Sequence, residues 1–252
     1  MAIKGKEVAL YLSGQSVPII ECNIVLYQPT IKEIVIFGED DFLSLCAMFG
    51  QTEKFLKDAK KGNPELENYS NLQILLAIIM QDMRLFASCQ QFFELLFPIY
   101  EPIFSENDIQ FKLKNEEKYV GALTPFNFEI FGEKLKDLFL IPSAQDEIEY
   151  NPEGEKAIKI AEKIMEGRKK LAEIKSSSDG NNSLFGSYIS ILSIGIPMDM
   201  NVLYGYTPFQ IYNLFTRYWA KVQSDFYQKI ATTPMMDVSK MKAPEEWTRN
   251  LY

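Results

Sequence analysis

The chain has 252 residues, 47% of them hydrophobic and 24% charged, which are ordinary values for globular proteins and exclude wholesale disorder. Its net charge is −8, and proteins that bind duplex nucleic acid usually present a basic face, so the charge disfavours that function. The many aromatic residues, 13% of the chain, suit either a densely packed core or a protein-binding surface.

The chain contains no histidine, which removes the commonest general base and the commonest zinc ligand. Catalytic triads of the Ser-His-Asp and Cys-His kinds are therefore impossible in their usual form. Neither a G-x-x-x-x-G-K-[ST] phosphate loop nor a G-x-G-x-x-G dinucleotide motif occurs. Cys22, Cys46 and Cys89 lack C-x-x-C spacing and are expected to be buried thiols in a reducing compartment. We therefore expect no catalysis, no cofactor and no bound metal.

The opening residues show no signal-peptide pattern. The longest apolar runs, 74–80 and 92–100, are far shorter than the roughly 20 residues that cross a bilayer. Both features predict a soluble, cytoplasmic protein.

The first elements in chain order are a predicted β-hairpin and two helices. Residues 7–12 and 17–27 are apolar and partly β-branched, and the turn cluster 13–16 separates them, which predicts a hairpin. A short helix is expected over 31–37, closed by Gly38. A longer helix follows, and its apolar stripe consists of Phe42, Leu45, Cys46 and Phe49.

Three carboxylates, Glu39, Asp40 and Asp41, open the longer helix. They suit the positive end of the helix dipole, and this is the simpler interpretation. The alternative is that they bind a divalent cation, or that one of them acts as an acid in a carboxylate-dependent enzyme.

The central part of the chain predicts apolar helices followed by a second hairpin. Residues 71–97 form one or two helices whose apolar positions cover more than half the circumference: Leu72, Leu75, Leu76, Ile79, Met83 and Phe86. Residues 109–113 and 119–123 then predict a second hairpin, and a helix is expected from Thr124 to about residue 139. Two hairpins among helices indicate a predominantly helical α+β fold with a small antiparallel sheet.

The rest of the chain predicts only helices. An amphipathic helix is expected over 152–175, a flexible linker over 176–183 and a short apolar helix over 184–194. We therefore divide the chain into an α+β domain, 1–145, and an all-helical region, 146–252.

The last helix has the clearest start signal in the chain. Thr207 is a natural N-cap, Pro208 occupies the first helical position, and Gln210 completes a capping box. The simpler interpretation of this helix is that its apolar face packs on the core. However, its aromatic side chains cannot share one narrow stripe, so some are expected to bind a partner protein. The candidate protein-binding residues, including one in the tail, are Phe209, Tyr212, Tyr218, Trp219, Phe226, Tyr227 and Trp247.

Two stretches resemble the tail assembly chaperones of tailed bacteriophages, especially phages of Gram-positive hosts. Residues 29–42 follow the pattern Pro-x-Ile-Lys-Glu-Ile-x-x-x-Gly-Glu-x-x-Phe, which is similar to the opening of those proteins. Residues 198–210 and the helix after them, with Arg217 and Lys221 as an Arg-x-x-x-Lys element, look like their closing region. The resemblance covers about a third of the chain.

The resemblance implies a largely helical, self-associating protein without catalysis or cofactor. Such chaperones coat the long, hydrophobic tape-measure protein in the host cytoplasm until tail-tube subunits replace them. A virion structural component, such as a neck, connector or baseplate subunit, is the alternative function. A carboxylate-dependent enzyme is a further alternative.

Overall fold

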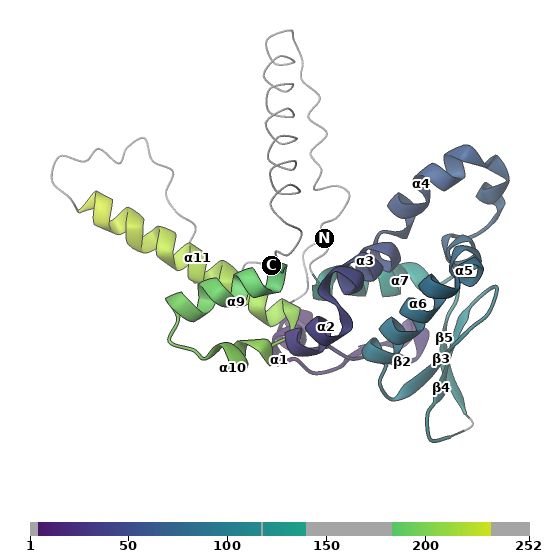
Figure 1. Ribbon diagram of the computed structural model, residues 1–252, viewed down its shortest axis with the longest axis horizontal. Helices are drawn as coiled ribbons and strands as arrows, with labels where there is room; N and C mark the ends of the chain where they lie inside the picture. Colours follow the sequence, from purple (N-terminus) through teal and green to yellow (C-terminus); the bar gives the residue numbers. More distant parts are fainter. Residues whose placement is uncertain (1–4, 117, 140–182, 233–252) are drawn as a thin grey trace, which may run out of the picture.

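The computed structural model describes residues 5–116, 118–139 and 183–232 (Figure 1). Within these ranges the chain is mainly helical and has two small antiparallel sheets, which confirms the predicted α+β class. The predicted helix over 152–175, the linker up to residue 182 and Trp247 lie outside the described residues.

The first predicted strand is wrong, because residues 7–12 belong to helix α1 (Gly5–Ser13). Gly14, with φ +69°, closes this helix, and its N–H donates to the Tyr11 carbonyl. A left-handed glycine is a common helix terminator, so the cluster at 13–16 ends a helix and does not turn a hairpin. Helical spacing also directs Tyr11 inward, where it is fully buried.

A smaller hairpin lies within the second predicted strand. Strands β1 (Val17–Ile19) and β2 (Ile24–Leu26) pair antiparallel, joined by the short 3₁₀ helix η1 (Ile20–Cys22). The chain reverses at Asn23, whose φ of 52° is left-handed. Asparagine tolerates this conformation better than most residues, so it replaces glycine in the turn.

Four helical elements follow, and the first two begin where the sequence predicts, although the longer predicted helix is divided into α3 and α4. Helix α2 (Ile31–Phe37) starts with a Thr30–Glu33 capping box and ends at Gly38, and α3 (Glu39–Gly50) follows directly. The four residues predicted for the apolar stripe of α3 are all buried. Helix α4 (Thr52–Gly62) leads into the 3₁₀ helix η2 (Pro64–Asn68).

The apolar stretch over 71–97 forms two helices, α5 (Asn71–Gln81) and α6 (Met83–Leu96), bent by 118°. Asp82 makes the break, because its carboxylate accepts from the Arg84 and Leu85 N–H groups and so caps α6. The sequence assigned Met83 to the apolar face, and this was wrong. Met83 starts a new helix in a different direction, and 87% of its surface is exposed.

The three-stranded sheet has the order β3-β4-β5 and contains the second predicted hairpin. Strands β4 (Ile109–Leu113) and β5 (Tyr119–Leu123) confirm that hairpin, and β3 (Tyr100–Phe104) is an additional strand. From the sequence, Pro98 and Pro102 are expected to end the apolar helices, but Pro102 lies within β3. Proline is tolerated at a sheet edge, where its missing N–H is not needed. Helix α7 (Phe128–Phe139) then packs on α3.

Aromatic rings occupy the centre of the core. The Phe93 ring centroid lies 5.0 Å from that of Phe49 and 5.9 Å from that of Phe131. The fully buried phenylalanines whose rings contact it come from α3, α6 and its C-cap, β4 and α7: Phe49, Phe92, Phe97, Phe111 and Phe131. Most phenylalanines of this part of the chain therefore serve packing and not binding.

Three further helices complete the described fold: α9 (Leu184–Gly195), α10 (Met200–Tyr204) and α11 (Pro208–Ala231). Helix α9 lies along the first half of α11, and α11 also contacts α1 and α7 (Figure 1). The Ile31 N–H donates to the Tyr206 carbonyl over 2.8 Å, which ties α2 to the start of α11. The division of the chain at residue 145 stays a prediction.

Among the described residues, no single helix is both long enough and apolar enough to span a membrane. Within the described ranges, α5 and α6 reach that length and apolarity only when taken together, with the bend of 118° between them.

All three cysteines are buried, as predicted, and we expect their thiols to resist alkylation in the folded protein. Burial raises the pKa of Cys22 and Cys89 to about 12 and raises the pKa of Cys46 well above its usual value. The thiolate is the reactive form, so iodoacetamide at pH 8 should leave the native protein unlabelled and label all three thiols in urea. Mass spectrometry measures this, and labelling of a thiol without unfolding would contradict the expected burial.

Candidate functional site

The start of α11 is held firmly by its own cap and by α1. The Thr207 hydroxyl accepts from the Gln210 N–H over 3.4 Å, and Gln210 Oε1 accepts from the Thr207 N–H over 2.9 Å. Gln210 Nε2 also donates to the Leu12 carbonyl over 2.8 Å. The predicted capping box is therefore confirmed, and the same glutamine connects α11 to the end of α1.

Phe209 is a core residue, so its assignment to a binding surface is wrong. Its side chain is fully buried, and its ring lies edge-on to Tyr11 with 5.3 Å between the ring centroids. The first turn of α11 is enclosed because α1 covers it, and the sequence prediction of a strand at 7–12 concealed this contact.

Tyr212 and Tyr218 face α9. The Tyr212 ring centroid lies 6.5 Å from that of Tyr188, and 37% of Tyr212 remains exposed. Tyr218 is half-buried against Gly195, where an added Cβ would lie 2.0 Å from the Tyr218 ring. The last residue of α9 therefore lies beside the middle of α11, and Tyr218 forms part of the contact between the two helices.

Beyond Tyr218, α11 carries large apolar side chains on its surface. Trp219 is 52% exposed, Phe226 60% and Val222 38%, whereas Tyr227 is half-buried. None of the described α11 residues after Asn213 is buried. The yellow half of the helix extends past α9 and away from the rest of the fold (Figure 1).

The three exposed side chains and the half-buried Ile230 share one side of α11. At 3.6 residues per turn, Trp219, Val222, Phe226 and Ile230 fall within an arc of roughly 80° and extend for about 16 Å. We call these four residues the outer stripe. Its spacing of three and four residues is the pattern with which one helix packs on another. The outer stripe is therefore the best candidate for a protein-binding surface on this helix.

The acidic cluster at the start of α3 has a structural partner. Glu39 Oε1 accepts from the N–H groups of Leu184, over 2.6 Å, and Phe185, over 3.1 Å, and the Ser183 hydroxyl bonds to Oε2. Glu39 thus caps the N-terminus of α9, where a negative charge is favourable. In the part of the chain that is described, no group of three or more acidic, Cys or His side chains is placed to hold a metal.

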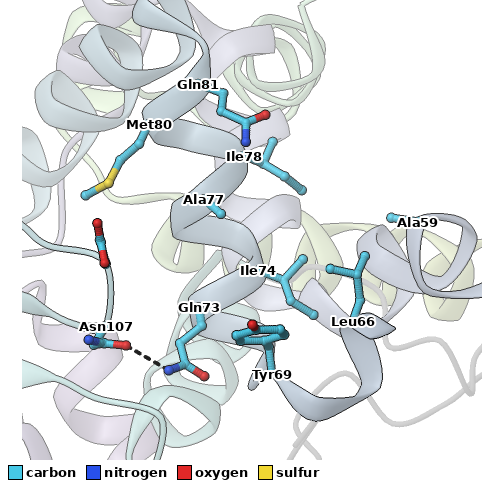
Figure 2. A pocket seen from close by; sticks show the side chains of 11 residues that line it. Ala59, Leu66, Tyr69, Gln73, Ile74, Ala77, Ile78, Met80, Gln81 and Asn107 are labelled. Atoms are coloured by element: carbon cyan, nitrogen blue, oxygen red, sulfur yellow. Dashed lines mark hydrogen bonds between the residues drawn. The ribbon is translucent and has the colours of Figure 1, made fainter. Parts of the chain in front are cut away.

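A concave feature lies at the other end of the molecule, where α4, η2, α5 and the β3–β4 turn meet (Figure 1). It is a groove of about 590 Å³ whose lining is mainly apolar (Figure 2). The sequence did not predict this groove, because its lining residues come from four separate elements. Helical periodicity predicts that Ala77 and Ile78 lie on a helix. It does not predict that the elements packed around this helix leave both residues partly exposed.

Two surfaces are therefore candidate binding sites: the outer stripe and the groove along α5, which we call the α5 groove. Within the described residues, neither surface carries a set of reactive side chains. No protein family, curated protein or solved structure matches this chain at a significant level.

Proposed function

We propose that this chain is a non-catalytic binding protein that holds an apolar helical segment of another protein against the outer stripe of α11. The observation that supports this most is the exposure of Trp219 and Phe226 on one side of a helix that extends beyond its neighbour α9. An exposed tryptophan loses more contact with water on binding than almost any other side chain, and tryptophan is enriched at the energetic centres of interfaces.

A helical client fits the shape of the outer stripe. A stripe of about 16 Å corresponds to three helical turns, and side chains at three- and four-residue spacing interlock with those of a second apolar helix. On a different side of α11, the exposed Lys221 and Asp225 keep the helix soluble until the client binds.

The tape-measure protein is the client that we propose. The resemblance of residues 29–42 and 198–210 to tail assembly chaperones supports it, and a tape-measure protein offers long apolar helices. The first of these stretches forms α2 and the start of α3, and the second leads into the cap of α11. The resemblance therefore includes the segment that positions the outer stripe.

We expect a long tape-measure reading frame beside this gene, and the test is co-expression with its product, followed by affinity purification. We expect the double substitution Trp219→Ala and Phe226→Ala to weaken binding at least about tenfold, because a hot-spot side chain contributes about 2 kcal/mol. Phe126→Ala is the matched control, since Phe126 is 97% exposed on another part of the surface and should be dispensable.

Two results would oppose the proposal. Equal recovery of the client with the double variant would remove the outer stripe from the interaction. Finding the protein in purified virions would favour the structural-component alternative, because an assembly chaperone leaves before the particle is complete.

A further inference from the structure

The α5 groove is open along the axis of α5. Gln73, Ile74, Ala77, Ile78 and Gln81 lie successively along the helix and form the floor of the groove (Figure 2). From Gln73 to Gln81 the helix advances about 12 Å, which is slightly more than two turns. The groove therefore has room for a short segment of chain lying along α5.

The two sides of the groove differ in chemistry. On one side, Ala59, Leu66 and Tyr69 from α4 and η2 present an apolar wall (Figure 2). On the other side, Met80 stands near the β3–β4 turn, which contributes Glu106 and Asn107. Tyr69 is 56% exposed and Met80 38%, so both would lose contact with water if the groove were filled.

Small side chains on the wall and on the floor allow a close approach. Ala59 and Ala77 are both exposed and have no side chain beyond Cβ, so a partner's side chains can enter between the larger residues. Gln73 Nε2 donates to Asn107 Oδ1 over 2.8 Å, which holds the β3–β4 turn against the start of α5. The groove is therefore formed before a partner binds, which lowers the entropic cost of binding.

The charge that lines the groove itself is acidic, whereas Lys60 and Lys61 lie in the last turn of α4. Glu106 is the only charged side chain among the described lining residues, and η2 adds the exposed carboxylates of Glu65 and Glu67 on either side of Leu66. The nearest lysine of α4 in the hydrogen-bond network, Lys60, donates to Asn71 Oδ1 over 2.6 Å at the start of α5. A partner that places cations beside its apolar residues is complementary to Glu106 and to the two carboxylates of η2.

We propose that the α5 groove binds a short amphipathic helix of another protein whose apolar side is bordered by Lys or Arg. Apolar side chains of that helix enter between Leu66, Ile74 and Ile78, and its cations face Glu65, Glu67 and Glu106. Recognition of an amphipathic helix by an apolar groove is a recurring mode of peptide binding. This site is separate from the outer stripe, since α5 and the far end of α11 lie at opposite ends of the molecule (Figure 1).

The test uses fluorescein-labelled synthetic peptides of about 16 residues with leucines at three- and four-residue spacing. One peptide carries Lys and Arg beside the leucines, a second carries Glu there, and a third has the first composition in scrambled order. Fluorescence anisotropy with the full chain should show the basic peptide binding at least fivefold tighter than the other two. Raising the salt concentration should reduce the difference in affinity between the basic and acidic peptides, because salt screens exposed charges.

Two arginine substitutions locate the site. Ala77→Arg fills the floor of the groove, whereas Ala87→Arg adds the same charge at an exposed position of α6. We expect Ala77→Arg to raise the Kd of the basic peptide at least tenfold and Ala87→Arg to leave it unchanged. Glu106→Gln should raise the Kd of the basic peptide severalfold and weaken the dependence of that Kd on salt concentration. Circular dichroism of each variant checks that the fold is retained.

Several outcomes would overturn the proposal. These are equal binding of the acidic peptide, no binding of the basic peptide, and unchanged binding by a folded Ala77→Arg variant. Light scattering adds another: if Ala77→Arg, but not Ala87→Arg, dissociates an oligomer, the occupant is a second copy of this chain. The Trp219→Ala and Phe226→Ala double variant should bind the basic peptide normally, so this proposal and the proposed function can fail separately.

Discussion

Replacing Phe209 with alanine is expected to lower the free energy of unfolding by about 3–5 kcal/mol, the range for truncating a fully buried aromatic side chain. Phe209 is 0% exposed and packs edge-on against Tyr11, so the substitution leaves a cavity at the junction of α1 and α11. The cap at Thr207 and the Gln210 bond to Leu12 hold the two helices in place, so the cavity is expected to collapse only partly.

Trp219→Ala is the matched substitution on the same helix. Trp219 is 52% exposed, so its removal should change the free energy of unfolding by less than about 1 kcal/mol, although the side chain is larger. Urea titrations followed by circular dichroism measure both variants. A large loss of stability for Trp219→Ala, or none for Phe209→Ala, would reverse the division of these aromatics into binding and core residues.

Gly121→Ala is expected to cost about 3 kcal/mol, the upper part of the usual range for overpacking. A Cβ at this position would lie 2.2 Å from the Cys22 carbonyl oxygen and 2.7 Å from that of Asn23. Both atoms belong to the backbone, so neither can rotate away as a flexible side chain would.

The reason for this close approach is that β5 packs directly on the turn of the first hairpin. The Asn23 side chain donates to the Val120 carbonyl, and Asn127 Nδ2 donates to the Glu21 carbonyl over 3.0 Å. A wider spacing at Gly121 would weaken both bonds, so the substitution should separate the hairpin from the sheet.

Gly62→Ala is the control for this prediction, because no atom lies within 4 Å of its added Cβ. We expect it to be neutral or slightly stabilising, since alanine restricts the unfolded chain more than glycine does. Thermal and urea unfolding of the two variants provide the comparison. Equal stabilities would show that the turn at Cys22 and Asn23 can move away from β5 at little cost.

Local signals in the sequence were sufficient wherever the cause of a structure is itself local. The capping box at Thr207 and the ends of helices at Gly38 and Gly195 depend on hydrogen bonds and dihedral angles within a few residues. The strand alternation of residues 109–113 likewise predicted β4. Each of these predictions was confirmed.

The errors arose where local signals have two meanings. A Ser-Gly cluster ends a helix as readily as it turns a hairpin, and only burial of Tyr11 against Phe209 makes the helix at 5–13 favourable. Pro102 stops a helix but is also accepted in an edge strand, and pairing with β4 decides between the two. In both cases a contact with a residue distant in the sequence decides which secondary structure forms.

The sequence by itself determined the α+β class, most of the helix boundaries and the presence of an aromatic last helix with a strong N-cap. Only the tertiary structure separated the aromatic residues of that helix, placing Phe209 in the core, Tyr218 against Gly195 and Trp219 at the surface. Only it showed that Glu39 caps α9 and that four elements form the α5 groove. The physical reason is that helical periodicity defines which residues share a side of a helix, whereas the elements that pack on it decide which side is covered.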